Sequence, residues 1–369
     1  MRVIDVRNVH QALYQGLAYI AVNGVRRDSR NGTVIVAPGP VVTIYRKPLE
    51  RVVFWPERDA NPFFHLYESL WMLAGRNDLK GLTRYVKDFD KFSDDGRTLD
   101  GAYGYRWREF FNIDQLKIIA GRLRDNPNDR RSVLQMWSPK HDLNLDPLST
   151  DADHLDVPCN LTATFQINTN GELDMAVFCR SNDMLLGAYG ANAVHFGFLQ
   201  EYMATWIGVP VGTYIQFSAN MHVYADKEGL GKTLVSCLPM LSAREERCFV
   251  YADETTPGVK PLLMYPAEFT NNLSPQEYME DLDDQIGYVL RSADLGFPEG
   301  QQTLGLTPGL KTIYNILRAH HIYKTTDGMG RFHQSIELLR TMDQNYDWTA
   351  VALDWLTRRF MKRTGQTHG

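Results

Sequence analysis

The chain has 369 residues, of which 44% are hydrophobic and 22% are charged, and its formal net charge is −5. This length suits one large domain with an extension, or two domains. No run approaches the roughly 20 consecutive apolar residues that span a membrane, and the first residues carry charges where a signal peptide has its apolar core. The mildly acidic balance gives no basic footprint for nucleic acid. We therefore expect a cytoplasmic protein that binds neither membrane nor nucleic acid.

The four cysteines lie in unrelated contexts, with no Cys-x-x-Cys pair. This usage fits a reducing compartment better than a disulfide framework. No pair of cysteines or histidines has the spacing of zinc ligands. We therefore expect no metal site.

Two apolar helices are predicted in the first hundred residues. Apolar side chains recur at helical spacing over 9–22 and again over 63–74. A turn-rich stretch at 23–32 and a strand-like stretch at 33–46 lie between them.

The later part of the chain is mixed at first and then helical. A β-hairpin is predicted over 160–178, followed by a helix over 192–207 and extended chain over 211–224. From about residue 295 the segments have helical periodicity with basic last turns. We therefore expect an α-plus-β body over residues 1–295 and a helical C-terminal region over 296–369.

Glu68 breaks the apolar pattern of its predicted helix, where it lies among Phe, Leu and Trp residues. A carboxylate in such surroundings is a candidate proton carrier. The other interpretation is that Glu68 lies on the exposed stripe of an amphipathic helix. The pattern alone leaves both interpretations open.

Cys159 directly follows Pro158, at the point where a loop meets the predicted hairpin. A cysteine at a strand end that faces a pocket lined with arginine can ionise and act as a nucleophile. Taken alone, it is more simply a small core hydrophobe, as we interpret the other three cysteines. Arginines in the loops near residues 30, 130 and 180 suit a phosphate dianion if they converge.

Taken together, these residues resemble the thymidylate synthase and deoxycytidylate hydroxymethylase family. The resemblance covers roughly residues 20–226 and rests on several motifs in the family's order. They are DSRNG (28–32), HLYESLWMLAGRND (65–78), LDGAYGYRW (99–107), NPNDRR (126–131), DVPCN (156–160), CRSNDMLLGAYGANAVHFGF (179–198) and HVY (222–224). The resemblance implies an α+β fold with a large mixed β-sheet and flanking helices, to which the helical C-terminal region is added.

The family's chemistry implies four catalytic residues. Cys159 would attack C6 of a pyrimidine nucleoside monophosphate, and C5 would then take the methylene carbon of 5,10-methylenetetrahydrofolate, the implied co-substrate. Glu68 would organise water and protons around the folate and the base. Tyr103 would order the water that removes the C5 proton, and Asp183 would hydrogen-bond the pterin.

Substrate binding is implied for a further set of residues. Arg30, Arg180 and Ser181 would bind the 5′-phosphate, and His222 and Tyr224 would bind the sugar 3′-hydroxyl.

The family's members are homodimers that share their active sites across a sheet face. Arg130 and Arg131 would therefore reach into the partner's site. This sharing makes the homodimer the expected active form.

The sequence departs from the synthases where the product is decided. Elimination of tetrahydrofolate leaves an exocyclic methylene at C5, which synthases shield until hydride arrives and hydroxymethylases leave open to water. Phe89 and Phe92 stand where synthases have tryptophans, and Asn160 replaces the usual histidine after the cysteine. The chain ends in the polar MKRTGQTHG. Together these departures favour capture of water over hydride transfer.

The base is expected to be read by Asn192, which matches the asparagine that reads uracil in synthases, where cytidylate hydroxymethylases have aspartate. Its amide can accept from uracil N3–H while donating to O4. Rotated by a half turn, it can donate to cytosine N3 and accept from the 4-amino group. Whatever orients this amide decides the base, and uracil is favoured.

We therefore expect a cytoplasmic enzyme, in the host cytoplasm if the protein is viral, that hydroxymethylates dUMP through a Cys159 adduct. The alternatives on the same scaffold are a dCMP or CMP hydroxymethylase and a divergent synthase that makes dTMP from dUMP. A non-catalytic nucleotide-binding homologue is the remaining alternative, against which the retained cysteine, glutamate, tyrosine and arginines argue.

Overall fold

The computed structural model describes residues 1–29, 32–143, 155–225, 251–253, 257–265 and 275–365. Its strands are β1 (Arg2–Val6), β2 (Val25–Ser29), β3 (Gly32–Val36), β4 (Val41–Tyr45), β5 (Val133–Gln135), β6 (Asn160–Ile167), β7 (Leu173–Cys179), β8 (Asn182–Asp183), β9 (Val211–Ser218) and β10 (Met221–Tyr224). The α-helices are α1 (Val9–Asn23), α2 (Pro62–Leu73), α3 (Tyr103–Arg108), α4 (Gln115–Asp125), α5 (Pro139–Asp142), α6 (Asn192–Ile207), α9 (Pro275–Asp294), α10 (Pro308–Thr325), α11 (Gly330–Arg340) and α12 (Asp347–Thr364). Short helical turns are η1 (Pro56–Arg58), η2 (Leu82–Arg84), η3 (Phe89–Phe92) and η4 (Met184–Ala191).

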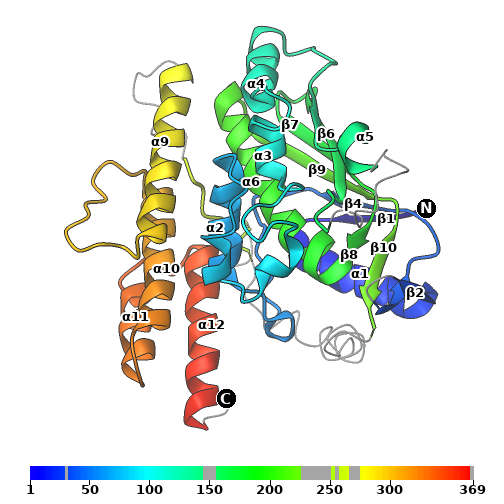
Figure 1. Cartoon of the computed structure of the whole chain (residues 1–369). Helices are drawn as coiled ribbons and strands as arrows, with labels where there is room; N and C mark the ends of the chain where they lie inside the picture. The colour runs from blue at the N-terminus through cyan, green and yellow to red at the C-terminus, as the bar shows by residue number, and fades with distance from the viewer. Residues whose placement is uncertain (30–31, 144–154, 226–250, 254–256, 266–274, 366–369) are drawn as a thin grey trace.

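The strands form two sheets (Figure 1). The larger has the order β1-β4-β9-β7-β6-β5, and the smaller has the order β2-β3-β10-β8. In the larger sheet β1 is parallel to β4 and β7 is parallel to β9, whereas the other neighbours are antiparallel. The sheet is therefore mixed, with helices beside it, and the expected α+β fold is confirmed. The helices expected at 9–22, 63–74 and 192–207 and the hairpin β6–β7 are also present.

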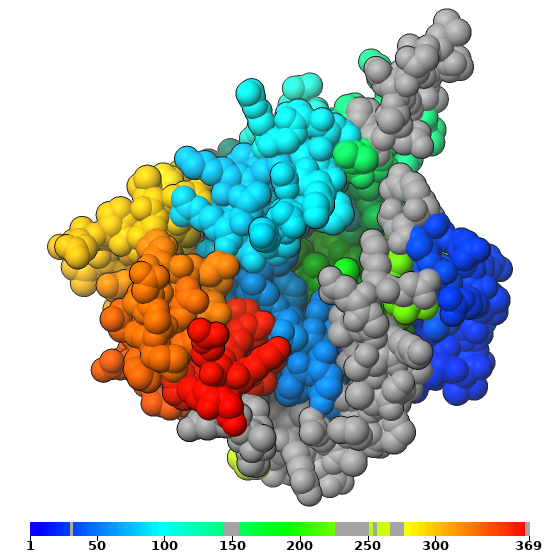
Figure 2. Space-filling model, turned by 60° about the horizontal axis from the view of Figure 1, so that its bottom comes forward, coloured from blue at the N-terminus to red at the C-terminus, as the bar shows by residue number. Residues whose placement is uncertain are grey.

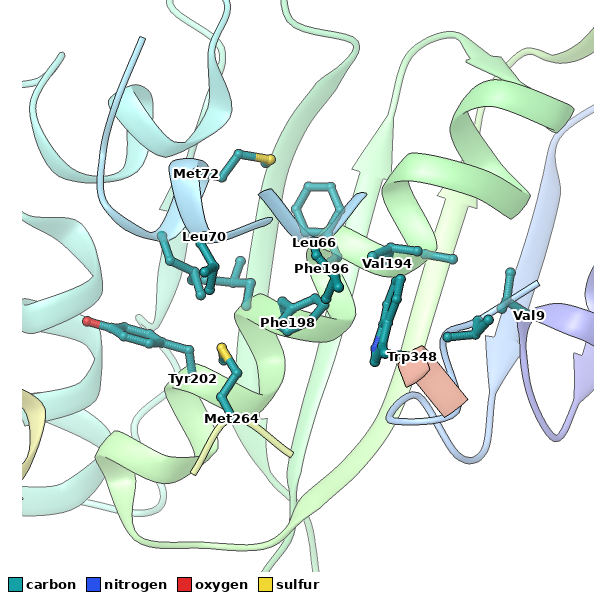
Figure 3. Close-up of a cluster of buried hydrophobic side chains, with 14 of the residues drawn as sticks. Val9, Leu66, Leu70, Met72, Val194, Phe196, Phe198, Tyr202, Met264 and Trp348 are labelled. Atoms are coloured by element: carbon teal, nitrogen blue, oxygen red, sulfur yellow. The ribbon is translucent and has the colours of Figure 1, made fainter. Parts of the chain in front are cut away.

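One face of the larger sheet is buried by helices. Side chains along β4, β7 and β9 alternate between buried and partly exposed, as a half-covered sheet requires. Helix α6 packs on β7 and β9, and α1 packs on β1. Figure 3 shows residues of α6, among them Phe196 and Phe198, packed with Leu66 and Leu70 of α2. The opposite face keeps an apolar, partly exposed surface.

Helix α2 lies at the centre of the molecule, with sheets on one side and the C-terminal helices on the other (Figure 1). It begins after Asn61, whose side chain accepts from the N–H groups of Phe63 and Phe64, and Pro62 occupies the first helical position. Every residue of the helix is buried except Phe64 and Glu68, which are partly buried. A helix that is apolar nearly all round must be covered on both sides.

The C-terminal helices supply the second cover of α2. Tyr67 Oη donates to Asp294 Oδ1 at 2.6 Å, and His320 stacks on Phe63 with 4.7 Å between ring centroids. Figure 2 shows these helices, in orange and red, directly beside the light-blue and cyan segments of the body. Helical structure after residue 295 is as expected, but the helical layer begins earlier, with α9 at Pro275. The domain boundary at 295/296 stays a prediction. In the described part of the chain, no helix is long and apolar enough to cross a membrane.

We predict that His320 makes stability depend on pH. Burial lowers the pKa of His320 to about 3, whereas an unfolded histidine has a pKa of about 6.5. Below the unfolded pKa the unfolded state binds a proton that the folded state excludes, so stability is lost as pH falls. His320→Phe should reduce the pH slope of the unfolding free energy between about pH 6 and pH 4 by about 1.4 kcal/mol per pH unit.

Urea unfolding of both proteins across this pH range measures the slope. His333→Phe is the control for the substitution itself, because His333 is exposed on α11 and lacks the burial on which the prediction depends. Identical slopes for wild type and His320→Phe would contradict the prediction.

Candidate active site

An open cavity of about 810 Å³ lies beside the smaller sheet. Seven of the predicted site residues line it: Phe92, Cys159, Arg180, Ser181, Asp183, His222 and Tyr224. They come from η3, from the segments around the start of β6 and the end of β7, and from β8 and β10. Four further predicted residues, Glu68, Phe89, Tyr103 and Asn192, are not among the described residues that line it. The fold thus brings together residues that lie far apart in the sequence.

Cys159 is held at the start of β6 by the hydroxyl group of Tyr103. The backbone N–H groups of Cys159 and Asn160 each donate to Tyr103 Oη at 3.2 Å. Burial raises the pKa of Tyr103 well above its ordinary value, so the phenol keeps its proton. Because its oxygen accepts from two amides, the phenol still has its own O–H to donate.

Burial also raises the pKa of Cys179 to about 12, which keeps that thiol protonated, as expected for a core cysteine.

Arg180 is turned toward the loop that leads into Cys159. Its Nε donates to Pro158 O at 2.9 Å, and its Nη2 donates to Val157 O at 3.2 Å. The guanidinium carbon lies 5.7 Å from the centroid of the Trp137 ring. These contacts place a positive charge at the cavity, next to the cysteine loop, and a guanidinium group there is suited to a phosphate.

Asp183 and His222 are paired across β8 and β10. Asp183 Oδ1 accepts from the N–H groups of Leu185 and Leu186 at 2.8 and 2.6 Å, which fixes the carboxylate at the start of η4. Burial lowers the pKa of His222, although the charge of Asp183 partly opposes this effect. The His222 and Tyr224 rings meet edge to face, with centroids 5.3 Å apart. A fixed carboxylate and a neutral imidazole therefore border the cavity together.

Asn192 begins α6 and belongs to a chain of buried polar side chains. Asn160 Nδ2 donates to Asn192 Oδ1 at 3.2 Å, and Asn192 Nδ2 donates to Asn182 Oδ1 at 3.0 Å. Asn182 Nδ2 then donates to Ser218 Oγ at 3.0 Å. Sequence reasoning identified Asn192 but missed the contacts that orient it, because its neighbours come from β6, β8 and β9.

Glu68 is paired with a histidine that sequence reasoning missed. Glu68 Oε2 lies 3.1 Å from His195 Nε2, and the two side chains are 14% and 4% exposed. Glu68 is therefore not on an exposed stripe. The ring of His65 lies 6.1 Å from that of His195, and burial holds the pKa of His65 well below its ordinary value, so His65 stays neutral. The signal for His195 was a single histidine within the apolar run NAVHFGF.

Phe89 and Phe92 form an aromatic pair in η3. Their ring centroids are 5.6 Å apart, and Phe89 also contacts Phe64 of α2 at 5.8 Å. Phe92 lines the cavity and is 56% exposed. The ring of Phe92, the more exposed of the pair, is therefore open to solvent.

The predicted arginines divide into three groups. Arg180 lines the cavity, whereas Arg130 and Arg131 are exposed just before the edge strand β5 and do not line the cavity of their own chain as described. Arg30 lies outside the described residues. Arg27, in the fully exposed strand β2, lines the cavity and was not predicted.

Among the residues that the structure describes, no group of three or more His, Cys, Asp or Glu residues is suited to hold a metal ion, and the expected absence of a metal stays a prediction.

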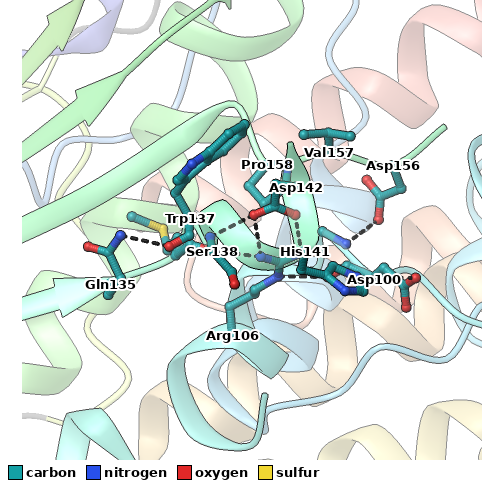
Figure 4. Close-up of polar contacts among 12 residues, drawn as sticks. Asp100, Arg106, Gln135, Trp137, Ser138, His141, Asp142, Asp156, Val157 and Pro158 are labelled. Carbon is teal, nitrogen blue, oxygen red and sulfur yellow. Dashed lines mark hydrogen bonds and ion pairs between the residues drawn. The ribbon is translucent and has the colours of Figure 1, made fainter. Parts of the chain in front are cut away.

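A buried ion pair supports the cavity wall (Figure 4). The guanidinium group of Arg106 donates to both carboxylate oxygens of Asp142, at 2.7 and 2.8 Å, and neither side chain is more than 2% exposed. On the other side of the cysteine loop, Asp156 Oδ2 accepts from Gly101 N at 2.8 Å. Burial raises the pKa of Asp156 to about 6. Hydrogen bonds thus join the segment that contains α3 both to the loop before Cys159, through Asp156, and to the cavity wall, through Asp142.

Comparisons with known proteins give consistent matches. A family model described as thymidylate synthase matches residues 14–243. The chain is 42% identical over 360 residues to a deoxyuridylate hydroxymethyltransferase of Pseudomonas phage M6, which covers 97% of this chain and 95% of that protein. It is 39% identical over 201 residues to a protein of the same name from Bacillus phage SP01, covering 52% and 50% respectively. It is 29% identical over 172 residues to a thymidylate synthase of Corynebacterium aurimucosum, covering 44% and 60%.

We predict that Tyr103→Phe loosens the cysteine loop. Two backbone N–H groups lose their acceptor, so the free energy of unfolding should fall by about 1–3 kcal/mol, and alkylation of Cys159 by iodoacetamide should change in rate. Urea unfolding and mass-spectrometric labelling measure the two effects.

Tyr105→Phe is the matched control on the same helix, because the Tyr105 hydroxyl makes no hydrogen bond with any described residue. It should change stability by less than about 0.5 kcal/mol. Equal losses of unfolding free energy in the two variants would show that the two backbone hydrogen bonds to Tyr103 do not hold the loop.

Proposed function

Because the chain belongs to the thymidylate synthase family, we propose that it transfers a one-carbon unit from 5,10-methylenetetrahydrofolate to C5 of dUMP and forms 5-hydroxymethyl-dUMP. The family and the class of one-carbon transferases are as expected from the sequence. The observation that carries the proposed product is the 42% identity, over nearly the whole chain, to a protein named deoxyuridylate hydroxymethyltransferase. Both relatives of that name belong to phages, so we propose the cytoplasm of a bacterial host as the location.

The geometry of the cavity supports nucleotide binding next to Cys159. Arg180 and Ser181 are suited to the 5′-phosphate, and His222 and Tyr224 are suited to the sugar hydroxyl. In this arrangement the Cys159 thiolate adds to C6, and the electron pair of the C5–C6 double bond moves to C5. C5 then forms a bond to the methylene carbon of the folate, while the bond from that carbon to N10 breaks and leaves its electron pair on nitrogen.

The second half of the proposed reaction decides the product. A water molecule takes the C5 proton, and the bond between the methylene carbon and N5 of the folate breaks. Tetrahydrofolate departs with that electron pair and leaves an exocyclic methylene on the base. The oxygen of a water molecule adds to this carbon and releases a proton, and the Cys159 thiolate then leaves C6. Glu68, whose Oε2 lies 3.1 Å from His195 Nε2, is suited to order this water and take its proton. The exposed ring of Phe92 leaves a path for water to reach the cavity.

A product assay tests the proposal. We expect purified protein, incubated with 5,10-methylenetetrahydrofolate and dUMP, to release tetrahydrofolate and add a hydroxymethyl group, as read by mass spectrometry. Cys159→Ala should abolish turnover while nucleotide binding remains, because the thiolate forms the adduct and the other groups bind the substrate. Parallel reactions with dCMP, UMP and CMP identify the preferred base and sugar.

A methyl group with dihydrofolate formation would replace this proposal with a divergent thymidylate synthase. Nucleotide binding without turnover in the presence of folate would leave a non-catalytic homologue.

We also propose a homodimer that shares its two active sites. The face of the large sheet that the helices leave uncovered carries apolar side chains, among them Phe178, which is 40% exposed and contacts Phe217 at 5.7 Å between centroids. An exposed apolar surface of this kind favours association. Arg130 and Arg131 are exposed beside the edge of the same sheet, where they are available to a partner.

Mixing two inactive variants tests the shared site. Cys159→Ala and Arg131→Ala homodimers should each have low activity, whereas mixed dimers contain one site with both residues intact and should regain activity. Phe178→Asp should shift the protein toward monomer in sedimentation measurements. Additive activities in the mixture, together with a monomeric wild type, would exclude a shared site.

A further inference from the structure

We propose that the buried side chains of Asn160, Asn192, Asn182 and Ser218 form an amide relay that selects the pyrimidine base, and that Asn160 sets its direction. This inference rests on the proposed function and on the expectation from the sequence that Asn192 reads the base. The relay residues are at most 7% exposed. Water therefore cannot replace a hydrogen bond that is lost within it.

The relay runs in one direction in the structure. Each amide donates through its nitrogen to the next residue, from Asn160 to Asn192, then to Asn182, and finally to Ser218 Oγ. If Asn192 alone turned over, its nitrogen would face the nitrogen of Asn160, and its oxygen would face the oxygen of Asn182. Two buried hydrogen bonds would be replaced by two repulsive contacts. Asn192 therefore cannot choose its orientation independently.

The whole relay can reverse, because the hydroxyl of Ser218 either accepts or donates. The end at Asn160 breaks this symmetry. In the observed direction the buried Oδ1 of Asn160 has no hydrogen-bond partner, and reversal would put the NH₂ group at that position. A buried N–H without an acceptor is rarer in proteins than an under-satisfied carbonyl. The surroundings of Asn160 therefore favour the observed direction.

The direction of the relay matters for the base. Asn192 keeps one N–H and one oxygen lone pair after its relay bonds are made. A base bonded to Cys159 at C6 presents its N3 and its 4-substituent to fixed positions. Uracil offers a donor at N3 and an acceptor at position 4, whereas cytosine offers the reverse. One relay direction therefore suits one base, and for a dUMP enzyme the observed direction is the one that reads uracil.

Two carboxylate substitutions on opposite sides of Asn192 test this inference. In Asn160→Asp the ionised side chain only accepts, so Asn192 must turn its nitrogen toward it, and the relay reverses with Ser218 as donor. The ratio of kcat/KM for dCMP to that for dUMP should rise by at least about tenfold. In Asn182→Asp the carboxylate accepts from Asn192 Nδ2 and from Ser218, which keeps the observed direction. This control should change the ratio by less than about threefold, within the range of ordinary context effects.

The assays are run from pH 7 to pH 9, because the shift in Asn160→Asp should grow as its carboxyl ionises. Asn160→Ala is the second variant, which removes the donor and should move the ratio toward equal use of the two bases. An unchanged ratio in both Asn160 variants, or the same shift in Asn182→Asp, would overturn the relay. If wild type instead prefers cytosine, the proposed function fails. The relay inference then still stands if Asn160→Asp moves the preference toward uracil.

Discussion

The arrangement of the candidate site depends on the hydroxyl group of Tyr103. It accepts hydrogen bonds from the N–H groups of both Cys159 and Asn160, so the proposed nucleophile and the first amide of the proposed relay are held by the same group. Tyr103 lies on α3, a helix of 6 residues, too short to be stable without tertiary contacts. Those contacts are the buried pair of Arg106 with Asp142 and the close approach of Gly104 to the backbone of Met72, which leaves no room for a Cβ.

The same contacts also fix the position of Glu68, the proposed proton carrier, relative to Cys159. Met72 lies on α2, one turn beyond Glu68. Helix α3 therefore contacts the helix that carries the carboxylate and binds the loop that carries the thiol. Since both groups are positioned by secondary structure and buried bonds, small displacements of either are resisted, as catalysis by positioned groups requires.

The sequence predicted what local patterns can encode and missed what depends on distant contacts. The periodicity at 9–22 and 192–207 corresponds closely to α1 and α6, because apolar spacing directly reflects the buried face of a helix. Helix α9 was missed although Met279, Leu282 and Ile286 have helical spacing and are buried; here the signal was present among many charged residues. The pairing of Glu68 with His195 and the place of Asn182 in the relay join segments far apart in the sequence. No local pattern reports such contacts.

Because α2 is covered on both sides, residues that do not line the cavity also affect the position of Glu68. Phe63 stacks on His320, His320 on Tyr85, and Tyr85 on Tyr67, with ring centroids 4.7 to 4.9 Å apart. This column of rings holds the outer side of the helix whose inner side holds the carboxylate. A substitution that changes the shape of a ring in the C-terminal helices should therefore also displace α2 and the Glu68 carboxylate that it carries.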